Sequence, residues 1–204
     1  MTPTGKEREV KFYIQDMEQL AERLNLTGAD LIQPRHLERN LRLDTIDGQL
    51  KAKGQILRLR QDSQARVTYK ANTQNEGGVL YRTEIEFVVD DFEVARKLFA
   101  ALGYQDAGLY EKYRRVYRLG AVDVMLDELP FGHFVEIEAP ANPLIEGVAQ
   151  MLGLDWTASI DAHYLGLFER IMAQTGHPFA DATFANFAGM AFRPADMQVR
   201  PADA

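Results

Sequence analysis

Apolar and polar residues alternate in eight short stretches of this chain, and such alternation is typical of β-strands that present one face to a core. The predicted strands span residues 7–14, 39–46, 56–61, 65–71, 79–89, 112–119, 121–128 and 133–139. Residues that favour tight turns occur between strands, at 47–48, 75–78, 119–120 and 130–132. Because short turns join neighbouring strands in opposite directions, the pattern predicts an antiparallel sheet.

Four other segments carry apolar residues at the spacing of an amphipathic helix. The first follows Asp16 and the second follows Asp91, and aspartate is a favourable residue at the start of a helix. The other two are predicted at about 143–152 and 160–173. The apolar faces of these helices need a surface to cover, and the apolar face of the sheet provides one.

The other face of the predicted strands is charged. Glu-x-Glu pairs occur at residues 7–9, 84–86 and 136–138, and side chains two residues apart in a strand point to the same side. Since nothing apolar covers this face, we expect it to point inward. The pattern favours an α+β fold in which eight antiparallel strands close into a β-barrel, a tunnel with a charged interior and helices packed outside.

A charged interior limits what the tunnel can hold, because burying isolated ions in a dry core is prohibitively costly. The predicted inward acids are Glu7, Glu9, Glu84, Glu86, Asp127, Glu136 and Glu138. The predicted inward bases are Lys11, Arg58, Arg60, Lys70, Arg82, Lys112, Arg114 and Arg118. Carboxylates bind hard divalent cations and arginine side chains grip phosphate oxygens, so the two sets together indicate a site for Mg²⁺ or Mn²⁺ and a polyanion.

Each charged motif alone has an ordinary explanation. A single Glu-x-Glu pair is usually a solvated face, and Arg58-Leu59-Arg60 alone is more often an exposed edge than a phosphate clamp. Three pairs with apolar residues opposite them, and basic strands between them, favour the tunnel instead. Glu84 and Glu86 are the weakest members of the acidic set, since they could simply neutralise neighbouring arginines.

The composition fits one globular core. With 204 residues, of which 46% are hydrophobic, the chain can bury a core of ordinary size. We predict one domain at 1–175 and a C-terminal extension at 176–204, which is too apolar for a free linker. A formal net charge of −7 argues against broad affinity for nucleic acid.

Other features narrow the class of protein further. The sequence has no cysteine, no signal-peptide pattern and no apolar run that could span a membrane, so we expect a cytoplasmic protein without a membrane partner. The histidines, His36, His133, His163 and His177, lack the spacing of metal ligands and are predicted to be surface or packing residues. The sequence leaves homodimerisation open.

The charged motifs, taken in order, resemble those of the CYTH domains, also called triphosphate tunnel metalloenzymes. Residues 7–11 read Glu-Arg-Glu-Val-Lys and are similar to the ExExK signature of that family. Further similar segments follow in the family's order at 43–45, 54–60, 68–70, 82–86, 112–114, 126–128 and 132–138. The resemblance covers about residues 5–172, and it departs at His133, where an acidic residue or asparagine is common.

The resemblance implies an eight-stranded tunnel that binds a triphosphate together with a divalent metal ion. The family includes inorganic triphosphatases, thiamine triphosphatases and class IV adenylate cyclases. We therefore expect a metal-dependent hydrolase that cleaves the terminal phosphoanhydride of inorganic tripolyphosphate, thiamine triphosphate or a nucleoside triphosphate. The alternatives are an adenylate cyclase that forms cyclic AMP and pyrophosphate from ATP, and a non-catalytic binder of polyphosphate or nucleotide.

Roles for individual residues follow from the motifs. The predicted ligands of Mg²⁺ or Mn²⁺ are Glu7, Glu9, Asp127, Glu136 and Glu138. Among these, Glu9, Glu136 and Glu138 are also predicted to be catalytic. The predicted substrate-binding residues are Lys11, Arg58, Arg60, Lys70, Arg82, Lys112 and Arg114. The chain has no GxxxxGK[ST] phosphate loop, so side chains rather than backbone amides would hold the phosphates.

Overall fold

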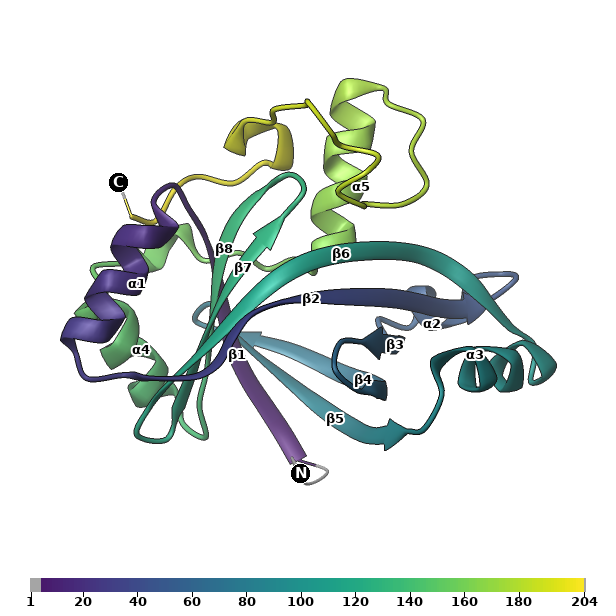
Figure 1. Cartoon of the computed structure of the whole chain (residues 1–204), viewed down its shortest axis with the longest axis horizontal. Coiled ribbons are helices and arrows are strands. Elements are labelled where there is room, and N and C mark those ends of the chain that lie inside the picture. Colours follow the sequence, from purple (N-terminus) through teal and green to yellow (C-terminus); the bar gives the residue numbers. More distant parts are fainter. Residues whose placement is uncertain (1–4, 204) are drawn as a thin grey trace.

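The computed structural model describes residues 5–203 and contains one sheet whose eight strands close into a ring (Figure 1). The strands are β1 (Gly5–Ile14), β2 (Asp30–Thr45), β3 (Ile56–Gln61), β4 (Ala65–Glu76), β5 (Val79–Val89), β6 (Tyr104–Leu119), β7 (Val122–Leu129) and β8 (Gly132–Glu138). Their order around the ring is β1, β5, β4, β3, β2, β6, β7 and β8, and β8 pairs with β1. All these pairs are antiparallel, so the predicted closed antiparallel sheet is confirmed.

The helices lie outside the ring. They are α1 (Met17–Leu26), α2 (Gln49–Ala52), α3 (Phe92–Ala101), α4 (Asn142–Met151) and α5 (Tyr164–Thr175), with short 3₁₀ helices at Trp156–Ala158 and Pro194–Met197. The Asp16 side chain accepts a hydrogen bond from the Gln19 amide, and Asp91 does the same for the Val94 amide. The four predicted helices are therefore confirmed, although α5 begins at Tyr164 instead of residue 160.

Two strands begin well before the residue at which their alternation predicts them to start. β2 begins at Asp30 instead of residue 39, and β6 begins at Tyr104 instead of residue 112. These two strands pair with each other, and their register shifts between Leu31 and Gln33, between Gln33 and His36, and between Leu41 and Leu43. Each irregularity moves later side chains to the other face, so the sequence loses its period of two there although the strands continue.

The core lies between the outer face of the ring and the helices. α1 and α4 lie side by side in Figure 1, and their residues Leu20, Leu24 and Ile145 are buried with Val124 and Ile137 of the sheet. α3 covers a second apolar surface, on β2, β3 and β4. The inner face of the ring is therefore left to polar side chains, which positions the site.

The C-terminal segment packs against the ring. Ala182 forms a bridge with Tyr110 of β6, and Pro201 forms one with Tyr13 of β1. Phe187 and Met197 are buried in an apolar cluster with residues of α5 and β8. In Figure 1 this segment passes over α5 and ends beside α1.

The helices within residues 5–203 are all too short or too polar to cross a lipid bilayer.

Candidate active site

The ring encloses a cavity of about 840 Å³, and more than half of the residues that line it are charged. The predicted site residues that line it are Glu7, Glu9, Lys11, Arg58, Arg60, Lys70, Arg82, Lys112, Arg114, Glu136 and Glu138. Glu84, Glu86 and Arg118 line it as well. The strand alternation thus assigned these side chains to the correct face of the sheet.

Most of the acids and most of the bases in the cavity lie on different parts of the ring. Six of the acids come from three neighbouring strands, with Glu136 and Glu138 on β8, Glu7 and Glu9 on β1, and Glu84 and Glu86 on β5. The other cavity-lining acids are Glu38 on β2, Asp62 after β3 and Asp123 on β7. We call β8, β1 and β5 the acidic wall. The opposite strands, β4, β3, β2 and β6, form the basic wall, whose cavity-lining bases are Arg42, Arg58, Arg60, Arg66, Lys70, Lys112, Arg114 and Arg118.

Three acids of the acidic wall are held by ion pairs with bases in the cavity. Lys70 Nζ lies 2.6 and 2.7 Å from the two carboxylate oxygens of Glu7, and Arg82 donates to Glu9. Lys11 Nζ lies 3.2 Å from Glu136. Burial opposes ionisation of Glu7, but the charges of Lys70 and Arg82 outweigh it and lower the pKa of Glu7 to about 2.

Glu138 and Glu84 are different, because the effect of burial on their pKa exceeds that of the nearby positive charge. Burial, with a further contribution from the charge of Glu7, raises the pKa of Glu138 to about 7. Burial also raises the pKa of Glu84, although Lys70 opposes the shift. In β8, Glu138 is paired with Glu9 of β1 on one side and with Asp123 of β7 on the other. This part of the acidic wall therefore has more carboxylates than bases to neutralise them, which is the donor set that a hard divalent cation needs.

Asp127 is the exception among the predicted site residues, because it does not line the cavity and is fully buried. It accepts hydrogen bonds from Lys112 Nζ at 2.9 Å, from Arg114 Nε at 2.6 Å and from the Tyr164 hydroxyl at 2.7 Å. These contacts hold Lys112 and Arg114 in place against the cavity. They do not favour Asp127 as a metal ligand, so that role stays a prediction.

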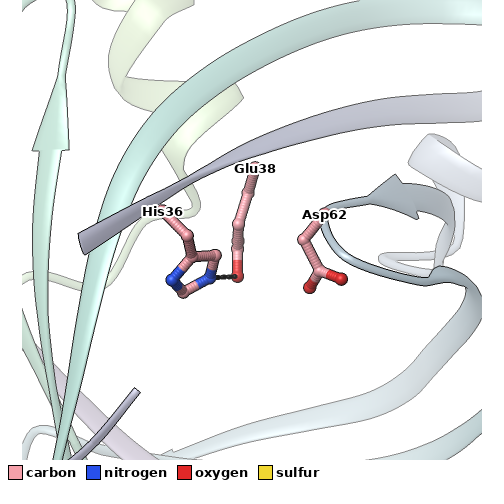
Figure 2. Close-up of side chains that lie close together, drawn as sticks. All are labelled: His36, Glu38 and Asp62. Carbon is pink, nitrogen blue, oxygen red and sulfur yellow. Dashed lines mark ion pairs between the residues drawn. The ribbon is translucent and has the colours of Figure 1, made fainter. Parts of the chain in front are cut away.

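A second group of potential metal ligands lies at the other end of the cavity from α5. The ligand atoms of His36, Glu38 and Asp62 all lie within 4.8 Å of one another (Figure 2). His36 Nε2 is 3.5 Å from Glu38. Arg60 and Lys112 each approach Glu38 to 3.5 Å, however, and Arg66 donates to Asp62 at 2.6 Å. These bases already neutralise both carboxylates, so a divalent cation is better accommodated at the acidic wall.

Several cavity residues were missed by the sequence analysis. Glu38 and Arg42 share one face of β2, opposite Leu41 and Leu43, which face the core. The predicted strand began at residue 39 and left Glu38 out, whereas Arg42 lay inside it but was not assigned to the inward bases. No local signal marks the other missed residues, Tyr110, His163 and Tyr164, because only the closed ring and the docking of α5 bring them to the cavity.

The first turn of α5 lines one end of the cavity with His163, Tyr164 and Leu165, and we call this the α5 end. His163 Nδ1 accepts a hydrogen bond from the Gly166 amide at 2.9 Å. Burial, together with the positive charges of Arg42 and Lys11, lowers the pKa of His163 to about 3. His163, predicted to be a surface or packing residue, therefore also lines the cavity. His36, for which the same prediction was made, is half-buried and lies 3.5 Å from Glu38.

Tyr164 contributes to the same end. Its hydroxyl donates to Asp127, and its ring centroid lies 4.1 Å from Lys11 Nζ and 5.1 Å from Lys112 Nζ. An aromatic face attracts cations, so the ring orients both lysines without neutralising them. Both lysines also pair with acids, Lys11 with Glu136 and Lys112 with Asp127 and Glu38.

A closed eight-stranded antiparallel ring around a cavity with an acidic and a basic wall defines a class of protein that binds a polyanion together with cations. The chain belongs to the CYTH domain family, whose sequence profile matches residues 5–144. Members of this family are divalent-metal-dependent enzymes that act on triphosphates, either as triphosphatases or as adenylate cyclases.

Individual relatives agree with this assignment. A protein of Methanocaldococcus jannaschii named "Putative adenylate cyclase MJ0240" is 28% identical over 142 residues, which are 69% of this chain and 80% of that protein. The structure of the PH1012 protein of Pyrococcus horikoshii is similar with a TM-score of 0.68 and 27% identity, over 78% of this chain and 97% of that one.

A more distant structure shares the fold. HpAC1 of Hippeastrum, described as a "putative adenylyl cyclase" with a dominant triphosphatase activity, has a TM-score of 0.61 and 19% identity, over 80% of this chain and 95% of that one. The likeness to HpAC1 shows the fold alone.

Proposed function

We propose that this protein is a metal-dependent hydrolase that cleaves the terminal phosphoanhydride of a triphosphate bound in the cavity. The observation that carries the proposal is the separation of charge into an acidic and a basic wall that face each other across one cavity. A triphosphate with its metal ions needs both signs of charge at once, since the phosphates bind to bases and the metal ions to carboxylates.

The basic wall is suited to hold the phosphates. Arg58, Arg60, Lys70, Lys112 and Arg114 all face the cavity, as do Lys11 and Arg82 from the other strands. Phosphoryl transfer requires little covalent chemistry from the protein. Orienting the phosphates and stabilising their charge therefore supply most of the rate acceleration. Asp127 supports this role because it fixes Lys112 and Arg114 before the substrate arrives.

The acidic wall is suited to hold Mg²⁺ or Mn²⁺. Burial and the charge of Glu7 raise the pKa of Glu138, so a cation bound beside it would stabilise its charged form. Glu7, Glu9 and Glu136 lie on the same wall. A divalent cation bound there would neutralise phosphate charge and lower the pKa of the attacking water. Oxygen ligands favour Mg²⁺ or Mn²⁺ over softer ions.

Adenylate cyclase activity is the second candidate, and one feature of the cavity favours it. Ile32, Phe87 and Val88 line the end of the cavity opposite α5, and Phe87 is 53% exposed. Exposed apolar residues at this end of the cavity give the apolar part of a nucleobase a surface to contact.

The experiment that tests the proposal offers the purified protein tripolyphosphate, thiamine triphosphate and ATP, with Mg²⁺ or Mn²⁺, and identifies the products. We expect orthophosphate from at least one substrate, and loss of this activity in excess EDTA and in Glu138→Gln. Full turnover in EDTA would contradict metal dependence. Tight binding of all three compounds without any turnover would instead support a non-catalytic binder.

A further inference from the structure

Arg42 is the least compensated base in the cavity. It lies directly opposite Arg58 in the pairing of β2 with β3, and both guanidinium groups face the cavity. Like charges at directly opposed positions of two strands destabilise a sheet. Among the side chains that the structure describes, no carboxylate forms an ion pair with Arg42, and its Nε has no hydrogen-bond partner. A half-buried guanidinium in this situation is stabilised by an anionic ligand, which offsets the cost of its burial.

His163 adds a neutral hydrogen-bond donor at the same end of the cavity. Its Nδ1 accepts the hydrogen bond from the Gly166 amide, so in the neutral ring the proton is on Nε2. The positive charge of Arg42 acts on this ring more strongly than that of any other charged side chain. A neutral imidazole that donates from Nε2 can bind an oxyanion without adding to the charge repulsion around Arg42.

The two ends of the cavity differ in a way that orients a substrate. Ile32 lies near the start of β2 and Phe87 near the end of β5, whereas Arg42 lies near the end of β2 and Ile56 at the start of β3. Because neighbouring strands are antiparallel, these two pairs of residues are at opposite ends of the ring. The exposed apolar residues suit an organic group, and the α5 end offers charge and hydrogen-bond donors.

We propose that Arg42 and His163, together with Arg58, form a pocket at the α5 end that binds the terminal phosphate of the substrate. This inference rests on the proposed function, because it specifies how the triphosphate lies in the cavity. The organic group, where the substrate has one, then lies at the end lined by Ile32 and Phe87. Arg42 and His163 are substrate-binding residues that lie outside the motifs of the sequence analysis.

The test compares the binding of inorganic tripolyphosphate by calorimetry, in EDTA so that no turnover occurs, in the parent and three variants. Arg42→Gln removes the charge, and His163→Ser removes the Nε2 donor while serine can still cap α5. Arg115→Gln is the matched control, since Arg115 also lies on a strand but pairs with the exposed Glu18 outside the cavity. We expect Arg42→Gln and His163→Ser each to weaken binding roughly tenfold or more, the range for hydrogen bonds to charged groups, and the control to match the parent.

Two further readouts separate ligand binding from a structural role. The Tm of unliganded Arg42→Gln should equal or exceed that of the parent, because the substitution relieves the repulsion with Arg58. In ¹⁵N spectra of the parent, the His163 ring should show the Nε2–H form, and its Nε2 signal should shift when tripolyphosphate is added.

Parent-like binding by both variants, or a His163 signal that does not respond to tripolyphosphate, would overturn the pocket. Weakened binding in both variants with no hydrolysis by the parent under any metal condition would support the pocket and overturn the proposed hydrolase.

Discussion

Individual carboxyl groups of the acidic wall differ in how they are neutralised, although they look alike in the sequence. Glu7 and Glu136 have bases in direct contact, and the pKa of each is lowered. Glu138 is two residues from Glu136 in the same strand, but burial and neighbouring acids raise its pKa. The sequence could place all three on one face of the sheet, yet it could not distinguish them, because their partners Lys70, Lys11 and Asp123 lie on other strands.

The pKa of Glu138 gives a prediction about stability without metal. Its carboxyl group has a pKa of about 7 in the folded protein and 4.5 as its reference value, so between these pH values only the folded state keeps the proton. The free energy of unfolding of the parent should therefore fall, relative to that of Glu138→Gln, as pH rises from about 4.5 to about 7, and level off above. The change should be at most about 3 kcal/mol.

Urea unfolding of both proteins in EDTA, at several pH values from 4.5 to 8, measures this difference. Mg²⁺ or Mn²⁺ should restore the stability of the parent at pH 8 but not that of Glu138→Gln. Parallel pH profiles for the two proteins would show that Glu138 is not held in a protonated form.

Arg58 provides a prediction for the basic wall. Its guanidinium is 3.1 Å from the Thr68 hydroxyl, 3.4 Å from the Tyr110 hydroxyl and 3.9 Å from Glu86, so no carboxylate neutralises it closely. Arg58→Ala should weaken tripolyphosphate binding by about 1.5–3 kcal/mol, the range for hydrogen bonds to charged groups. The fold should survive, since Arg42 loses a like charge opposite it. Arg115→Ala serves as the control, and equal affinity for Arg58→Ala and the control would place Arg58 outside the binding site.

At the scale of secondary-structure elements, the regular strands could be predicted and the irregular ones only in part. β1, β3, β7 and β8 alternate without interruption, so their faces and approximate ends were correct. The first half of β2 could not be predicted, because its register shifts destroy the alternation. For the same reason, the closeness of His36 to Glu38 and Asp62 could not be predicted. The contribution of the first turn of α5 to the cavity could not be predicted either, because it depends on where the helix packs against the ring.

The C-terminal segment gives a prediction about packing. Phe187 is 3% exposed, and its ring contacts those of Phe131, Phe168 and Phe192. Phe187→Ala should lower the free energy of unfolding by about 3–5 kcal/mol, the usual cost of removing a buried aromatic ring. Leu26→Ala is the control because Leu26 is 81% exposed, and it should change stability by less than about 0.5 kcal/mol. Similar unfolding midpoints for both variants would mean that this segment contributes little to the fold.

In the molecule as a whole, closure of the ring brings charged side chains from different strands together around one cavity. The strands that carry the acids and bases are far apart in the sequence, and the order β8, β1, β5 against β4, β3, β2, β6 brings most of these side chains into two walls. Their inward direction could be predicted from alternation, but not their distribution around the ring. The strand order also brings Arg42 opposite Arg58, which no local pattern reveals.

Incubation of the protein with ATP and Mg²⁺ or Mn²⁺, followed by identification of every phosphorus-containing product, tests the central claim most directly. The proposed hydrolase leaves the α-phosphate untouched, so the account predicts ADP and orthophosphate, with no product when EDTA is in excess. Attack of the ribose 3′-hydroxyl on the α-phosphate would instead yield cyclic AMP and pyrophosphate. That result would contradict hydrolysis of the terminal phosphate and assign the same cavity to a cyclase.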